Sequence, residues 1–208
     1  MANGTVVIID YGMGNLWSVA SAVKFTGFDP MISADPNSIA EADTLILPGV
    51  GSFNRAMHSI RSSEIDKAIG EALHANAAKL LGICLGMQLL GRSGTEDGLT
   101  DGLGLVNNEV RKITSVSSQQ LKVPNIGFRD VQADKEMVMF EGLSTNSRFY
   151  FVHSFCMQIL DDSSKYAISH HGQPFVAAIE SGRVFGTQFH PEKSQKNGLK
   201  VLSNFLNS

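Results

Sequence analysis

KLLGICLGMQLL, residues 79–90, is the stretch that decides how this chain is predicted to fold. Its first part is a short apolar strand and its last part is typical of a helix, so the chain must turn sharply between them. The turn has the form Gly-x-Cys-x-Gly, which is the pattern of a nucleophile elbow with a cysteine at its centre. We expect glycine at positions 82 and 86 because so tight a turn leaves no room for a Cβ atom there.

The predicted elbow places Cys84 above the end of a strand and at the N-terminus of a helix. The positive end of the helix dipole favours a thiolate at such a place, which would make Cys84 a nucleophile. The alternative is a small buried side chain in a core strand, the environment of most intracellular cysteines. The elbow pattern alone leaves both interpretations open.

Before the elbow, strands and helices alternate along the chain. Strands are predicted at residues 5–9, 29–33 and 44–47. The sequence predicts a helix after Asn15, which is a suitable N-terminal cap. A second helix is predicted from Ser63 to Asn76, with Ser63 and Asp66 at the spacing of a capping box. This β-α-β order predicts an α/β fold, a doubly wound, mostly parallel sheet with helices on both faces.

The pattern changes after the elbow. Residues 92–104 are rich in Gly, Ser, Thr and Asp and are predicted to form a surface loop. Strands without intervening helices are expected at residues 106–113, 123–131 and 148–160. Such a run predicts an antiparallel β extension of the main sheet. The chain should close with a hairpin, residues 175–180 and 184–189, and a helix, residues 197–205.

Length and composition limit the class of protein. A chain of 208 residues suits one sizeable core, so residues 1–208 are expected to form a single domain. The net charge of -3, without a basic run, argues against a nucleic-acid partner. No apolar run approaches the ~20 residues of a membrane span, and the sequence does not begin like a signal peptide. We therefore expect a cytoplasmic protein with no membrane partner, in which Cys84 and Cys156 are reduced.

A second glycine-rich turn, PGVGSF at residues 48–53, follows the strand at residues 44–47. Two glycines at a strand end let backbone N–H groups turn toward a neighbouring site, as in an oxyanion hole. An ordinary tight βα turn would have the same composition, so this loop does not decide the function by itself. The Gly-x-Gly at Gly12 and Gly14 lacks the third glycine of a dinucleotide-binding loop.

A cysteine nucleophile needs a base, and the base needs an acid that orients it. His190 is the strong candidate because it ends a predicted strand and Glu192 follows two residues later. Pro191 fixes the backbone between them, so the carboxylate can hold one tautomer of the imidazole. The other histidines are interpreted as solvated (His58, His74), as loop residues (His170, His171), and as structural or substrate-facing (His153). The cysteine and histidine spacings do not match a zinc site, and we expect no metal or cofactor.

Three segments in this order along the chain resemble the triad glutamine amidotransferases. They are PGVGSF at residues 48–53, GICLGMQ at 82–88 and HPEKS at 190–194. Within that family, DYGMGNL at residues 10–16 and YFVHS at 150–154 are similar to one branch, the glutaminase subunits of imidazole glycerol phosphate synthase from histidine biosynthesis. The resemblance extends from about residue 5 to residue 206.

The resemblance implies a class I glutamine amidotransferase fold and a Cys84–His190–Glu192 triad. Cys84 would attack the side-chain amide of glutamine, while His190 moves the proton and Glu192 orients the ring. The implied oxyanion hole is formed at Val50, Gly51 and Leu85. The implied substrate-binding residues are Gly49, Gln88, His153 and Ser154.

The resemblance also implies a partner. Ammonia would pass into a separate (β/α)8 cyclase/synthase subunit that makes imidazole glycerol phosphate and an aminoimidazole carboxamide ribotide, in a heterodimer. Lys193 and Phe128 are the expected interface positions. Trp17, residues 124–129 and Phe155 depart from the family's usual pattern and concern the partner rather than the triad. These departures leave open the alternative that the chain donates ammonia for amidation of a surface-polysaccharide sugar. A cysteine peptidase or a free-standing glutaminase fits the residues less well.

Overall fold

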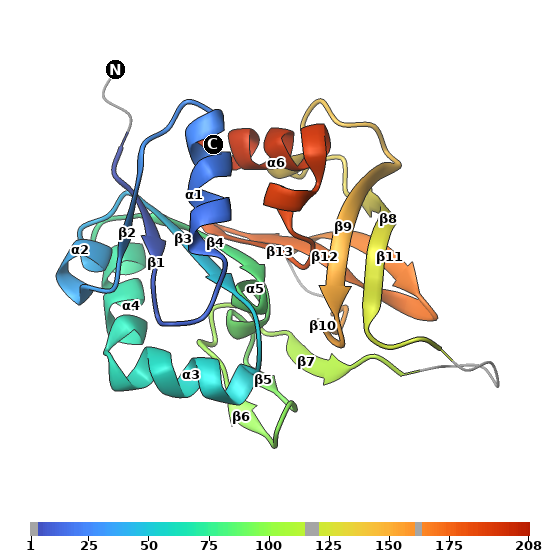
Figure 1. The fold of residues 1–208 in the computed structure, drawn as a ribbon, viewed down its shortest axis with the longest axis horizontal. Coiled ribbons are helices and arrows are strands. Elements are labelled where there is room, and N and C mark those ends of the chain that lie inside the picture. The colour runs from blue at the N-terminus through green and yellow to red at the C-terminus, as the bar shows by residue number, and fades with distance from the viewer. Residues whose placement is uncertain (1–3, 115–120, 161–163) are drawn as a thin grey trace.

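A computed structural model of the chain describes residues 4–114, 121–160 and 164–208. The strands of its main sheet are β1 (Val6–Ile9), β2 (Pro30–Ser33), β3 (Thr44–Gly49), β4 (Lys79–Cys84), β8 (Asn125–Ala133), β9 (Ser147–His153), β11 (Lys165–His171), β12 (Gln173–Ser181) and β13 (Val184–Thr187). Their order in space is β2-β1-β3-β4-β13-β12-β11-β8-β9 (Figure 1). The first five strands in this order are parallel, and each later strand pairs antiparallel with its neighbour.

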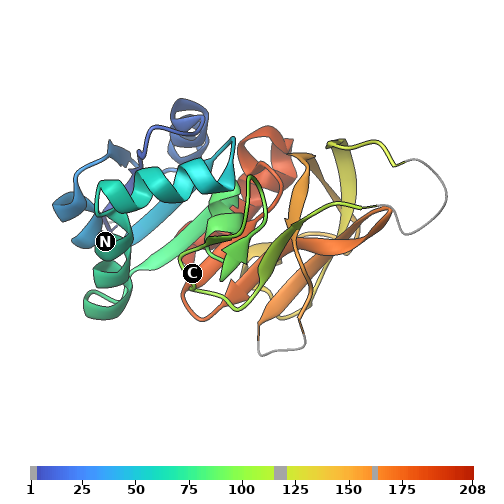
Figure 2. The same cartoon turned by 90° about the horizontal axis from the view of Figure 1, so that it is seen from below.

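Helices cover both faces of the parallel half of the sheet (Figures 1 and 2). One face carries α1 (Leu16–Phe25) and α6 (Gln195–Asn207), which contribute Val23 and Leu202 to one apolar core. The other face carries α2 (Pro36–Ala40), α3 (Phe53–Ser62) and α4 (Ile65–Ala75), which bury their apolar stripes in a second core. The predicted doubly wound sheet with an antiparallel extension is therefore confirmed.

A small second sheet lies beside the main one. Its strands, in spatial order, are β10 (Phe155–Met157), β7 (Glu109–Lys112), β5 (Ser93–Gly94) and β6 (Thr100–Asp101). The prediction that residues 92–104 form only a surface loop is thus wrong in part. Gly94 is buried, and a Cβ atom there would lie 2.7 Å from the ring of Phe53. Close packing against α3, which the composition does not reveal, explains this glycine.

Two local predictions are corrected by the neighbouring elements. The expected capping box does not form, because Ser63 donates its hydroxyl to the Ser59 carbonyl at 2.6 Å and so ends α3. The residue before α4 is Glu64, with a φ of 58° and no side-chain cap. The loop predicted for His170 and His171 is instead the end of β11, which pairs with β12.

The strand predicted at residues 148–160 is divided at Ser154 into β9 and β10, which belong to different sheets. The closing hairpin and helix are found as predicted, with Ser181 opposite Val184 at the turn. The longest helix has 13 residues, and in the described ranges no helix has the length and apolarity of a bilayer span.

Candidate active site

The predicted elbow joins β4 to α5 (Leu85–Leu89) at Cys84. Cys84 has φ 56° and ψ -109°, a conformation that a non-glycine residue keeps only where the surrounding structure enforces it. A Cβ atom on Gly82 would lie 2.6 Å from the Gly86 carbonyl oxygen, and one on Gly86 would lie 1.7 Å from that of Leu47. The elbow and its need for both glycines are therefore confirmed. Because α5 has only five residues, the groups around the sulfur matter more for a thiolate than the helix itself.

The predicted base and its acid lie beside the elbow. Thr187 of β13 pairs with Ile83 of β4, so the residues that follow β13 come next to Cys84. His190 Nδ1 lies 2.8 Å from Glu192 Oε1, and the two side chains are only 4% and 1% exposed. A carboxylate accepts hydrogen bonds, so Nδ1 carries a hydrogen and the ring is held as the sequence predicted. Among the described residues, Nε2 has no hydrogen-bond partner.

Charge and burial act against each other on His190. Burial lowers the pKa of the ring, but Cys84 and Glu192 outweigh it and raise that pKa to about 10. The thiol thus acts on the imidazole by proximity, although the two do not form an aligned hydrogen bond. A protonated imidazole next to a cysteine sulfur is the arrangement that activates a cysteine nucleophile.

Besides the imidazole, two polar groups of the described residues lie near the sulfur of Cys84. It lies 4.0 Å from the carbonyl oxygen of Val152, which can accept a thiol hydrogen, and 3.7 Å from Nε2 of Gln188. Gln188 is fully buried, and its Oε1 accepts a hydrogen bond from Gln88 Nε2 at 2.9 Å. The sequence analysis did not single out Gln188. The sequence did contain a signal for Gln188, because it is a polar residue at the end of a predicted apolar strand. It lies two residues before His190, and in an extended strand residues two apart point to the same side.

A cavity of about 340 Å³ opens over Cys84. The predicted residues that line it are Val50, Gly51, Leu85, Gln88, His153 and Ser154. The structure therefore brings the predicted oxyanion-hole residues and three of the four predicted substrate residues to one cavity. The sequence analysis missed Glu96 and Pro124, which also line the cavity; Glu96 falls in the predicted loop of residues 92–104 and Pro124 in the predicted strand of residues 123–131.

Gly49 is the predicted substrate residue that does not line the cavity. It is buried at the end of β3, opposite Cys84 in the strand register. A Cβ atom there would lie 2.3 Å from the Tyr11 hydroxyl and 3.0 Å from the Gly86 nitrogen. Gly49 therefore allows the loop to approach the elbow closely.

Tyr11 is a further buried residue at this place that the sequence analysis missed. Its hydroxyl has no hydrogen-bond partner within the described ranges. Burial, with the charge of Cys84 adding to it, raises the pKa of Tyr11 above its ordinary range. The phenol is therefore neutral and lies just beneath the Gly49 turn.

His153 is buried at the end of β9. Burial is the main cause that lowers its pKa to about 4, so the ring is neutral at pH 7. Its Nδ1 lies 2.8 Å from the Phe155 carbonyl oxygen and its Nε2 lies 3.0 Å from Asn125 Nδ2. His153 thus presents a fixed, uncharged ring to the cavity.

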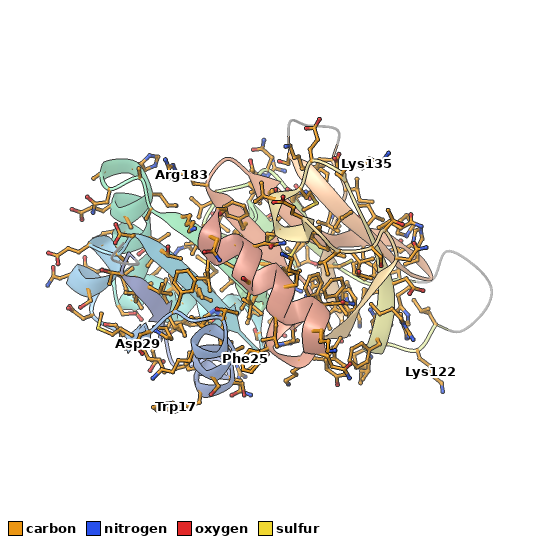
Figure 3. The ribbon with its side chains drawn as sticks, turned by 90° about the horizontal axis from the view of Figure 1, so that it is seen from above. Trp17, Phe25, Asp29, Lys122, Lys135 and Arg183 are labelled. Atoms are coloured by element: carbon orange, nitrogen blue, oxygen red, sulfur yellow. The ribbon has the colours of Figure 1, made fainter. Side chains whose placement is uncertain are left out.

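The two predicted interface residues lie outside the cavity. Lys193 is exposed at the end of η2 (Pro191–Lys193), and Phe128 packs edge-on against Tyr150 with ring centroids 5.6 Å apart. Trp17 and Phe25, each 78% exposed, project outward from α1 (Figure 3). In the part of the chain that the structure describes, no three His, Cys, Asp or Glu side chains are grouped to hold a metal ion.

The other cysteine is not part of this site. Cys156 is fully buried in β10, and burial raises the pKa of its thiol to about 12. It does not line the cavity over Cys84. A thiol that stays protonated in an apolar core is chemically inert, so Cys156 is a packing residue.

The family model for glutamine amidotransferase class-I matches residues 7–208, and the chain belongs to this family. A relative from Methanosarcina barkeri, the imidazole glycerol phosphate synthase subunit HisH, is 44% identical over 204 residues, which cover 97% of each chain. The protein of the same name from Escherichia coli K12 is 40% identical over 201 residues, 97% of this chain and 98% of the relative. A crystal structure of a glutamine amidotransferase has a TM-score of 0.74 at 17% identity, covering 97% of this chain and 99% of that one, which supports the fold.

Proposed function

We propose that this chain is the glutaminase subunit of an imidazole glycerol phosphate synthase. It hydrolyses glutamine to glutamate and passes the ammonia to a (β/α)8 cyclase/synthase subunit, which makes imidazole glycerol phosphate and an aminoimidazole carboxamide ribotide in histidine biosynthesis. The observation that carries the proposal is the buried Cys84, His190 and Glu192 group at the 340 Å³ cavity. The names of the relatives from Methanosarcina barkeri and Escherichia coli support this acceptor, and no observation favours a sugar acceptor.

In the proposed reaction, the Cys84 thiolate attacks the side-chain amide carbon of glutamine. Backbone N–H groups at Leu85 and at the turn of residues 50–51 hold the oxyanion. The C–N bond then breaks as His190 gives its proton to the leaving nitrogen, and ammonia departs. His190 next takes a proton from water, which attacks the γ-glutamyl thioester, and glutamate leaves with regeneration of the thiolate.

Glu192 has a fixed part in this cycle. Because it accepts from Nδ1, the ring can exchange protons only through Nε2, which has no hydrogen-bond partner among the residues that the structure describes. The carboxylate also stabilises the imidazolium that the first half of the reaction uses and the second half restores. Gly49, Gln88, His153 and Ser154 are proposed to hold the glutamine, with Gln88 and His153 fixed by hydrogen bonds to the Phe155 carbonyl.

The partner is proposed to cover the face around the exposed Lys193 and the β8 residue Phe128. Lys193 directly follows Glu192, the proposed triad acid, in η2. Phe128 packs on Tyr150 of β9, and the Tyr150 carbonyl accepts a hydrogen bond from the backbone nitrogen of His190 at 2.9 Å. A subunit that contacts Lys193 would lie one residue from Glu192. A subunit that contacts Phe128 would be separated from His190 by Tyr150. This closeness supports direct transfer of ammonia from the site into the partner.

The test is glutamate release from glutamine by the purified chain, alone and with the barrel subunit and its ribonucleotide ligand. The proposal expects strong stimulation by the pair. Cys84→Ala should abolish glutamine-driven synthesis in the complex and leave ammonia-driven synthesis intact, and Cys156→Ala is the matched control that should retain both. If Cys84→Ala also loses ammonia-driven synthesis, Cys84 is structural and the proposal fails. If the barrel gives no stimulation while a glutamine-analogue label still modifies Cys84, the glutaminase stands and the acceptor is wrong.

A further inference from the structure

The carbonyl of Phe155 determines the direction of a series of buried hydrogen bonds that ends at Cys84. It accepts from Gln88 Nε2 at 2.8 Å and from His153 Nδ1 at 2.8 Å. A backbone carbonyl can only accept, so both nitrogen atoms must carry hydrogens. This single atom therefore removes the usual ambiguity of an amide flip and of a histidine tautomer.

One branch leads to the nucleophile. The second hydrogen of Gln88 Nε2 points to Oε1 of Gln188 at 2.9 Å. Since Oε1 of Gln188 must accept, its NH₂ group is the end that faces the Cys84 sulfur, at 3.7 Å. All three side chains are at most 6% exposed, so water competes little for these bonds.

The other branch leads away from the site. With its hydrogen on Nδ1, His153 must accept at Nε2, and Asn125 Nδ2 supplies the donor at 3.0 Å. Asn125 Oδ1 then accepts from Arg129 Nε at 3.2 Å. Every donor in the series thus has one consistent direction, which is the condition for a buried polar network to stabilise a single arrangement.

We propose that Gln188 is a positioning residue for the nucleophile, whose NH₂ group donates to the Cys84 thiolate and holds it toward the cavity. The inference rests on the proposed function, because it takes Cys84 as the nucleophile. The other contact of the sulfur, the Val152 carbonyl, can be satisfied only by the thiol form. The donor from Gln188 therefore favours the thiolate, and the acceptor at Val152 favours the thiol.

The ionisation of Cys84 also depends on the groups packed around it from other elements. The titratable side chains that face it or its cavity are Tyr11, Glu96, His153, His190 and Glu192. Tyr11 and His153 are neutral at pH 7, and His190 with Glu192 forms the ion pair described above. Gln188 is an uncharged donor, so its effect adds to theirs without introducing a titration of its own.

The test is the pH dependence of Cys84 alkylation by iodoacetamide, followed by peptide mass spectrometry so that Cys156 is counted separately. Gln188→Met removes the donor and keeps the length of the side chain. It should raise the midpoint of Cys84 alkylation by about one pH unit, the size expected for one hydrogen bond to a charged group. Thr187→Val is the matched control: one residue away, it removes a buried hydroxyl that has no hydrogen-bond partner within the described ranges, and it should leave the midpoint unchanged. An unchanged midpoint in a folded Gln188→Met protein overturns the proposal.

A second measurement needs no variant at Gln188 and decides the case if Gln188→Met does not fold. The side-chain amide ¹⁵N and ¹H resonances of Gln188 should titrate with the midpoint of Cys84 alkylation in the wild type, and should lose this titration in Cys84→Ala. Resonances that do not follow Cys84 overturn the inference. Labelling by a glutamine analogue separates the two proposals: failure to label Cys84 in the wild type rejects the glutaminase itself, whereas normal labelling with an unchanged midpoint rejects only the role of Gln188.

Discussion

Replacing Glu192 by glutamine should destabilise the protein most at neutral pH and less as the pH approaches 10. The carboxylate accepts from His190 Nδ1 at 2.8 Å, and both side chains are almost completely buried. Glutamine keeps the shape and one acceptor oxygen but removes the negative charge that faces the imidazolium. A hydrogen bond between a charged pair of this kind contributes about 1.5–3 kcal/mol, so we expect the variant to lose about 2 kcal/mol at pH 7.

The pH dependence follows from the proton on His190. Its pKa rises from 6.5 to about 10 on folding, so over this range the folded protein keeps a proton that the unfolded chain releases. The stability that this proton contributes is fully present below pH 6.5 and is lost as the pH rises through 10. A loss of about 2 kcal/mol corresponds to a folded pKa about 1.5 units lower in the variant. The two proteins should therefore lose stability in parallel at first, and their difference should narrow between about pH 8.5 and pH 10.

The assay is urea unfolding of both proteins under reducing conditions at several pH values from 7 to 10. At pH 7 the melting temperature should also fall by about 4–8 °C, as expected for about 2 kcal/mol in a chain of this size. Glu180→Gln is the matched control, because Glu180 is buried but accepts from the backbone nitrogens of Val138 and Met139, which do not titrate. A difference between wild type and Glu192→Gln that stays constant or widens up to pH 10 would refute the assignment of the proton to His190.

Three further outcomes can be measured on the purified chain. Gly86→Ala should lower the free energy of unfolding by several kcal/mol or prevent folding, because its Cβ would lie 1.7 Å from the Leu47 oxygen. Gly70→Ala in α4, where no atom of the described residues lies within 4 Å of the added Cβ, should instead raise the free energy of unfolding by about 1 kcal/mol in the same urea titration. Cys156→Ala should cost about 1 kcal/mol for its small cavity and leave the rate of Cys84 alkylation unchanged, and a loss of that rate would contradict its assignment as a packing residue. Lys79→Met should accelerate trimming of the chain end by carboxypeptidase, because the Lys79 ammonium holds the carbonyl oxygens of Phe205 and Ser208 at 2.7 and 2.8 Å; equal trimming would show that these bonds do not hold the end of α6.

The elbow and the pairing of His190 with Glu192 were predictable because their signals are local. Gly82, Cys84 and Gly86 lie within five residues, and His190 and Glu192 lie two apart, so spacing predicts the turn at Cys84 and the contact of His190 with Glu192. The closeness of His190 to Cys84 depends instead on the pairing of β13 with β4. The doubly wound, mostly parallel sheet could be inferred from the alternation of strands and helices up to the elbow. The antiparallel extension followed from the run of strands after it.

The features that the sequence analysis missed depend on hydrogen bonds to residues outside the local segment. The hydrogen bond between Gln88 and Gln188 joins residues 100 positions apart, and its direction is set by a carbonyl on a third segment. Spacing rules cannot report such a bond, so Gln188 was read as one more strand residue. The failed capping box has a related cause, because Ser63 was already used by α3, a helix that the sequence analysis had not placed.

The parallel strands β3, β4 and β13 are neighbours, with Gly49 opposite Cys84 and Thr187 opposite Ile83. Adjacent strands are about 4.8 Å apart, and this pitch spaces the glycine turn, the sulfur and the segment that carries the imidazole. The backbone hydrogen bonds between these strands thus set the distances among the glycine turn, Cys84 and His190. A slip of one residue in any of the three strands would displace the glycine turn, Cys84 or His190, although none of these residues had been substituted. Substitutions deep in these apolar strands would consequently appear in an activity screen as catalytic defects, although the altered residues never touch glutamine.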